Sequence, residues 1–195
     1  MGIKRQLAIG AGVLASLLLA PTAAHAAPAG KHCVVSASTG AAMVCYSSFR
    51  TAISNASGGR VTDAPADAKV ALNDQKFAKK LDDLPSARSN APTAAAASNI
   101  IISIEYTGED FGGSSLTVTG THACDNALSP VEFTLASMPS GWNDDIESFR
   151  AFANCAAKHF LHIGATGPFN DNAFFFSRTE FESWLDDEVS SIAWT

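Results

Sequence analysis

The sequence lacks the short motifs that mark common catalytic sites. It contains no G-x-S-x-G nucleophile turn, no HExxH zinc-binding helix and no Walker-type phosphate loop. The histidines suggest no shared metal, because His159 and His162 are three residues apart and would face opposite sides of a strand. His122 precedes a cysteine and is expected at the surface. We therefore expect a protein that is not an enzyme.

Long apolar runs are also scarce. One run of secretory length, Leu7 to Ala20, follows the basic residues Lys4 and Arg5 and precedes the A-x-A cleavage signal Ala24-His25-Ala26. This run is too short, and wrongly flanked, for a membrane span. The pattern predicts a signal peptide over residues 1–26 and a secreted mature protein that is soluble, since no second run of membrane length follows.

Basic side chains are too few to favour nucleic acid as a partner. The sequence has 13 Lys and Arg residues against 19 Asp and Glu, and loss of Lys4 and Arg5 with the signal leaves 11 basic residues and a net charge of −8. A negative surface argues against non-specific nucleic-acid binding and is compatible with a site for a cation.

Only four cysteines are present, and none of them lies in a CxxC motif. An even number in a secreted chain predicts two disulfides rather than a metal site or a catalytic thiol. From the sequence alone, the four cysteines could form two disulfides in three different ways. We favour Cys33–Cys45 and Cys124–Cys155, because each pair stays within one part of the chain.

Three parts follow the expected signal. Residues 27–85 form an N-terminal segment with helical spacing at Phe49, Ala52, Ile53 and Ala56, and a second helix is predicted to begin at Asp67. Residues 86–98 are rich in alanine and typical of a linker. The N-terminal segment is expected to be a small helical pre-domain or a loosely docked arm, and a role as pro-segment or adaptor for a partner is also open.

Residues 99–195 alternate between apolar and polar side chains. The run from Ile100 to Tyr106 predicts a strand with Ile100, Ile102, Ile104 and Tyr106 on one face. Further short runs of this kind, separated by Gly, Asn and Asp, predict an all-β sandwich of eight strands with a single core. The tryptophans Trp142, Trp184 and Trp194 and the run Phe174–Phe176 are expected in that core.

Two motifs repeat within this part. The first is aromatic-x4-aromatic-x-Gly, seen in Tyr106 to Gly113 and altered in Phe160 to Gly167, where Ala165 replaces the second aromatic residue. The other is an acidic signature at Asn143–Ser148 and again at Asp186–Ser191, 43 residues later. The second signature reads (N/D)(N/D)-x-x-(S/T)-S in full, whereas Glu147 takes the fifth place of the first signature.

These motifs resemble those of the βγ-crystallin family, specifically its secreted microbial members. The resemblance covers residues 99–195 and implies a mainly all-β fold with two Greek keys, residues 99–155 and 156–195, in a βγ-crystallin-like sandwich. It also suggests a relationship to crystallin-like microbial metalloproteinase inhibitors.

The resemblance implies Ca²⁺ sites at one end of the sandwich. Carbonyl oxygens would come from Asp145, Glu188 and the hairpin loops, and a hydroxyl would come from Ser190. Ca²⁺ accepts such mixed oxygen ligands, and the few charged donors predict weak binding, with a Kd on the order of 10⁻⁴–10⁻³ M. The full set of expected site residues is Thr107, Asn143, Asp144, Asp145, Glu147, Leu161, Asp186, Asp187, Glu188 and Ser190.

Two other interpretations stay open. The acidic signatures also fit turns that merely precede strands, because Asp and Asn are common in such turns. The alternative function is inhibition of an extracellular protease, for which a rigid loop would enter the protease cleft. The segments Thr121–Val131 and Gly164–Ala173 are the candidates for that loop.

Overall fold

A computed structural model describes residues 30–38, 42–84, 100–125, 130–169 and 173–195. The expected signal peptide (1–26) and the expected linker (86–98) lie outside these residues. Among the described residues, no helix is both long enough and apolar enough to cross a membrane.

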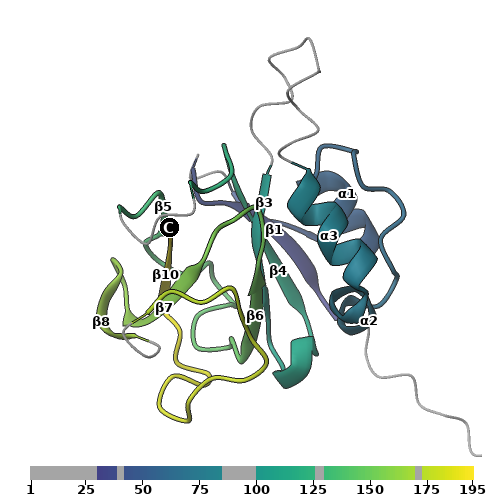
Figure 1. The fold of residues 1–195 in the computed structure, drawn as a ribbon. Helices are drawn as coiled ribbons and strands as arrows, with labels where there is room; N and C mark the ends of the chain where they lie inside the picture. Colours follow the sequence, from purple (N-terminus) through teal and green to yellow (C-terminus); the bar gives the residue numbers. More distant parts are fainter. Residues whose placement is uncertain (1–29, 39–41, 85–99, 126–129, 170–172) are drawn as a thin grey trace, which may run out of the picture.

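The described part of residues 100–195 contains eight strands in two sheets (Figure 1). The strands are β3 (Ile100–Tyr106), β4 (Ser115–Gly120), β5 (Phe133–Leu135), β6 (Ser148–Ala151), β7 (Ala157–His162), β8 (Thr166–Phe169), β9 (Ser177–Arg178) and β10 (Ser191–Trp194). One sheet contains the order β4-β3-β6-β9, and the other has the order β5-β10-β7-β8. Each half therefore places its third strand, β5 or β9, in the sheet of the other half. This order is that of two interlocked Greek keys and confirms the predicted βγ-crystallin-like fold.

Large apolar side chains fill the space between the two sheets. Trp142, Phe149 and Trp194 are buried there, as predicted for the tryptophans. The same prediction was wrong for Trp184 and Phe176, which are 42% and 54% exposed. Phe176 directly precedes β9, an edge strand of two residues, and Trp184 lies in a turn after it, so neither residue is part of an alternating strand.

Strand β3 packs against apolar side chains on both of its faces. Its pairing with β4 shifts register in the first half of the strand, which marks a β-bulge. Ile100 and Ile102 face the core between the sheets, whereas Ile104 and Tyr106 face the opposite side. The prediction of a single apolar face was therefore wrong, because one extra residue in a strand reverses the faces of all residues that follow.

The N-terminal segment contributes two strands that the sequence analysis missed. Strand β1 (His32–Ser36) pairs parallel with β4, and β2 (Val44–Tyr46) pairs antiparallel with β1. They extend the first sheet to the six-strand order β2-β1-β4-β3-β6-β9. A parallel partner about 80 residues along the chain leaves no local pattern in the sequence.

Three helices cover the outer face of this sheet (Figure 1). They are α1 (Phe49–Ala56), α2 (Ala68–Asn73) and α3 (Gln75–Asp83), which confirms the predicted helical content of the segment. Asp67 and Asp74 are the N-cap residues of α2 and α3, and their carboxylates accept hydrogen bonds from amides of the first turn. The buried faces of the helices form a second core with Ile104 and Tyr106 of β3. The segment is thus packed against the sandwich and is not a loosely docked arm.

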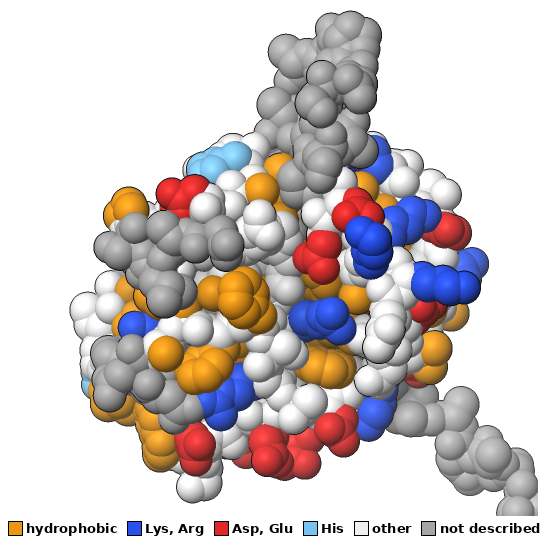
Figure 2. Space-filling view, viewed as in Figure 1, with side chains coloured by type: hydrophobic (Ala, Val, Ile, Leu, Met, Phe, Trp, Pro, Cys, Tyr) orange, Lys and Arg blue, Asp and Glu red, His pale blue; other side chains and the backbone are white. Residues whose placement is uncertain are grey.

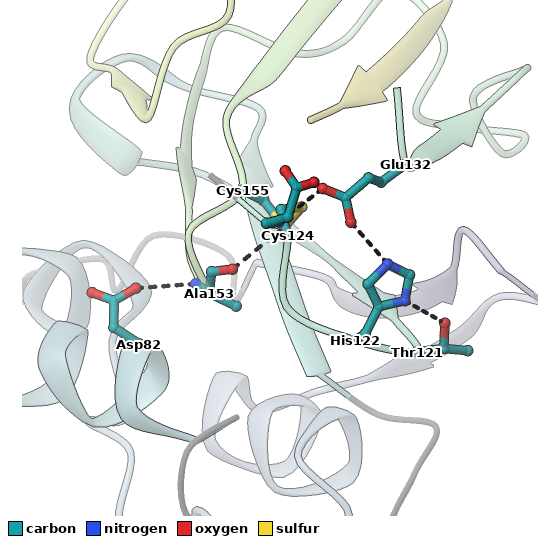
Figure 3. The surroundings of a disulfide bond; sticks show 8 residues. Asp82, Thr121, His122, Cys124, Glu132, Ala153 and Cys155 are labelled. Atoms are coloured by element: carbon teal, nitrogen blue, oxygen red, sulfur yellow. Dashed lines mark hydrogen bonds and ion pairs between the residues drawn. A yellow bond between two sulfur atoms is a disulfide. The ribbon is translucent and has the colours of Figure 1, made fainter. Parts of the chain in front are cut away.

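Two disulfides join the pairs that the sequence favours. Cys33 is bonded to Cys45 between β1 and β2, and Cys124 is bonded to Cys155. Figure 3 shows Ala153 between the second bond and Asp82 of α3. Cys124 N donates to the carbonyl oxygen of Ala153 at 3.0 Å, and Ala153 N donates to Asp82 of α3 at 3.2 Å.

Candidate metal centre

The two acidic signatures meet at one end of the sandwich. Asp144 and Asp187 hold the second place of their signatures, and both have a left-handed backbone, with φ of 57° and 55°. The N–H group of Asp144 donates to the carbonyl oxygen of Val189 at 3.2 Å, so the first signature contacts the second directly. In Figure 2, acidic side chains gather along the lower edge of the molecule. The repeat seen in the sequence is therefore also a repeat of backbone conformation.

The sixth place of each signature is a buried serine that holds its own hairpin. Ser148 Oγ donates to the carbonyl oxygen of Gly108 at 2.6 Å and accepts from the N–H of Phe111 at 3.1 Å. Ser191 makes the two equivalent bonds in the second hairpin, at 2.5 and 3.0 Å. The serines thus fix each hairpin loop relative to its signature.

The second hairpin keeps the backbone of the first despite its substitution. Three residues of each hairpin have positive φ: Asp110, Phe111 and Gly113 in the first, and Gly164, Ala165 and Gly167 in the second. What differs is the packing. The ring of Phe111 lies edge-on to Tyr106, with 5.7 Å between centroids, and Ala165 has no ring for such a contact.

The residues in the fifth places of the two signatures point in different directions. Ser190 Oγ donates to Asp144 Oδ1 at 3.4 Å and so reaches across to the first signature. Glu147 instead turns toward its own hairpin, where its Oε2 atom accepts from the N–H of Glu109 at 3.0 Å. The Glu147 carboxylate is therefore already engaged with the hairpin loop.

Several carbonyl oxygens at this end are available to a ligand. Within the described residues, the carbonyl oxygens of Thr107, Asp145 and Glu188 accept no hydrogen bond. The preceding hairpin carbonyls are occupied, since Tyr106 O accepts from Glu147 N and Phe160 O accepts from Ser190 N, both at 2.9 Å. Leu161, the fourth expected carbonyl donor, lies within β7. Asn143 donates to its neighbour Asp144.

Negative charge accumulates here without a basic partner. Burial, followed by the charge of Asp187, raises the pKa of Asp145, of Glu147 and of Asp186. In the described part of the chain, no Lys, Arg or His forms an ion pair with any of these four carboxylates. A bound cation would lower the repulsion between them.

One buried oxygen atom supports the fit of a cation. Asp186 Oδ1 is buried and has no hydrogen-bond partner among the described residues, although a buried carboxylate oxygen is normally paired. Among the described residues, no group of three His, Cys, Asp or Glu side chains is placed to bind a metal ion without other ligands. A hard cation bound here would therefore need backbone carbonyls and water as well as side chains.

The core contains a polar pair that the sequence analysis did not identify. His159 Nε2 lies 2.9 Å from Glu105 Oε2, and the side chains of both residues are fully buried. Ser103 Oγ donates to the other Glu105 oxygen, and the His159 ring packs between Phe149 and Phe181. Neither side chain is exposed to solvent. His162, by contrast, is exposed, as expected for the opposite face of β7.

The loops considered for protease inhibition are only partly described. Residues 126–129 of Thr121–Val131 and residues 170–172 of Gly164–Ala173 lie outside the described residues. Within the first loop, His122 Nε2 lies 2.8 Å from Glu132 Oε2, and the His122 side chain is about half exposed, as expected (Figure 3). Protease inhibition stays a prediction.

Comparison with known proteins gives matches among solved structures alone. No family model matches the sequence, and no curated protein matches it. One match is a structure from work on the evolution of the eye lens βγ-crystallin domain fold. The two sequences are 23% identical, the alignment covers 48% of this chain and 84% of the matched chain, and the TM-score is 0.38. A βγ-crystallin domain from Flavobacterium johnsoniae is 21% identical, with 48% and 93% coverage and a TM-score of 0.35. One from Clostridium beijerinckii is 16% identical, with 48% and 95% coverage and a TM-score of 0.34. About half of this chain is thus similar to βγ-crystallin domains.

Proposed function

We propose that the mature protein is a secreted, non-enzymatic calcium-binding protein with a structural or stress-protective role. The observation that carries the proposal is the buried oxygen of Asp186, which lies in a cluster of carboxylates and has neither a hydrogen-bond partner nor a basic partner among the described residues. Calcium would supply the positive charge that this end of the sandwich lacks. The sandwich would then be more stable with the ion than without it.

The proposed ligands come from the two signatures and their hairpins, and the carbonyl oxygens of Thr107, Asp145 and Glu188 accept no hydrogen bond within the described residues. Ser190 would supply its hydroxyl, and Asp145 and Glu188 would supply carbonyl oxygens, completed by hairpin carbonyls at Thr107 and Leu161 and by water. Asn143, Asp144, Asp186 and Asp187 would shape the loops and provide negative potential. Neutral ligands predominate in this set, which supports weak binding with a Kd on the order of 10⁻⁴–10⁻³ M.

Calcium titration of the whole mature chain, monitored by its melting temperature near pH 7, tests the proposal. At ten times the Kd, binding stabilises the folded state by about 1.4 kcal/mol, which corresponds to a shift of roughly 3–6 °C. Ser190→Ala should reduce the shift, whereas Ser183→Ala, at an exposed position in the loop before the second signature, should leave it unchanged. Absence of any shift at millimolar calcium would sink the proposal.

A further inference from the structure

A cleft separates the N-terminal segment from the first folded hairpin. Its volume is about 880 Å³, and its walls come from the start of β1, the residues before α1, the start of α2 and the hairpin after β3. Of the expected calcium ligands, Thr107 alone lines it. The cleft thus shares Thr107 with the proposed calcium site but contains no residue of the two acidic signatures.

A buried histidine forms part of the cleft wall. His32 is 8% exposed, and its ring packs edge-on to Phe49 with 5.6 Å between centroids. The Nδ1 atom lies 2.9 Å from the hydroxyl of Ser115. This bond fixes the orientation of the ring and leaves the Nε2 atom for a bound molecule.

Helix α1 begins at the cleft without a cap. Ser47 and Ser48 line the cleft, and Ser48 holds the N-cap position, but its side chain makes no capping hydrogen bond. The first turn contains no acidic residue, and its amides at residues 49–51 have no acceptor within the described part of the chain. Helices α2 and α3 differ, since an aspartate caps each. Uncapped amides at a helix start favour a negative group.

Two lysines place positive charge at the same cleft. Lys31 and Lys69 both line it, and Lys69 lies 3.8 Å from Asp110 in an exposed ion pair. Asp67 is the acidic residue that lines the cleft, but its carboxylate accepts from the N–H of Val70 at 2.9 Å and so caps α2. The cleft thus collects donors and positive charge on a chain whose net charge is −6.

We propose that this cleft binds a small molecule through an anionic group, a phosphate or a carboxylate. The amides of the first turn of α1, with Lys31 and Lys69, hold the anionic group. His32 Nε2 and the Ser47 hydroxyl bind other polar atoms of the ligand. Phe111, which lines the cleft beside the hairpin, provides an apolar contact for the remainder. This site does not depend on calcium.

Inorganic phosphate is the probe for the test, added to the whole mature chain with EDTA present and ionic strength held constant. We expect saturable amide shifts in the NMR spectrum at residues 49–51 below about 50 mM phosphate, a range in which exposed charges are already screened. Replacing both Lys31 and Lys69 by Ala should weaken binding at least about fivefold, because two charge-assisted bonds are lost. Lys79→Ala, on the exposed side of α3, is the matched control.

The variant Ser48→Asp separates binding from folding. Its carboxylate would cap α1 and occupy the place of the anion, so the melting temperature should rise while the phosphate-induced shifts disappear. The proposal is overturned if wild-type protein shows no saturable shift, or if the Ser48→Asp variant binds phosphate as well as wild type. Because calcium is absent throughout, either result is independent of the calcium proposal.

Discussion

Glu105 Oε2 lies 2.9 Å from His159 Nε2 in the fully buried space between the two sheets. The pair joins β3 of the first Greek key to β7 of the second. A polar pair at this depth requires that both partners be present, because burial of either group without its partner is costly.

Glu105→Ala is therefore expected to destabilise the protein by about 3–5 kcal/mol, as loss of one partner of a buried pair does. Glu105→Gln keeps a hydrogen-bonding group and should cost less. Unfolding in urea measures both. A loss below about 1 kcal/mol for Glu105→Ala would show that the pair contributes little.

The adjacent residues Ser190 and Ser191 should differ in what they control. Ser191→Ala removes two hydrogen bonds in a buried site and should lower the free energy of unfolding without calcium by about 1–3 kcal/mol. Ser190→Ala should change mainly the calcium-dependent shift in melting temperature. Equal effects of the two variants in both measurements would contradict the separate roles.

Glu147→Ser restores the hydroxyl that the first signature lacks and breaks the hydrogen bond from Glu109 N. Because the Glu147 carboxylate is held by the hairpin, we propose that the wild-type protein binds one calcium ion, at the site that contains Ser190, and we expect the variant to bind up to two. Isothermal titration calorimetry at millimolar calcium measures this number. Glu132→Ser, at a carboxylate far from the signatures, is the control, and an unchanged number in Glu147→Ser would refute the expectation.

Stability should depend on pH through Asp145, Glu147 and Asp186. Burial and Asp187 raise the pKa of each group, so the folded state binds protons more tightly than the unfolded chain. The contribution of these three groups to stability is complete at pH values below their pKa in the unfolded chain. It is lost as pH rises through their higher pKa in the folded state. Calcium should offset this loss, and its stabilising effect should be larger near pH 7 than near pH 4. A pH-independent calcium effect would argue against binding at these carboxylates.

Removal of residues 27–98 should leave an unstable sandwich. The deletion uncovers Ile101, Ile104, Tyr106 and Phe152, which the helices bury, and each large side chain contributes about 1.5–3 kcal/mol when buried. The fragment is expected to bind a hydrophobic dye and to unfold at a lower urea concentration than the mature chain.

Mass spectrometry of the secreted form shows whether residues 27–98 remain in the secreted protein. A fragment as stable as the mature chain would mean that the segment is dispensable.

The sequence by itself determined the features that local pattern encodes. The alternation of apolar residues predicted the sandwich, the resemblance of the repeated motifs to those of βγ-crystallins implied the pair of Greek keys, and the grouping of the cysteines favoured the two disulfides that the structure contains. These features depend on neighbours in the chain or on repeats of one motif, which a single sequence displays directly.

Tertiary structure alone decided the rest. Because of the bulge in β3, the residues after it face the opposite side of the sheet from the one that simple alternation predicts. Strand β1 pairs parallel with β4, which lies about 80 residues further along the chain. Glu147 turned toward its own hairpin, while Ser190 reached the opposite signature, although both hold the same place in the repeat. The physical reason is that register, strand partners and side-chain direction follow from packing between distant segments, for which local sequence carries no signal.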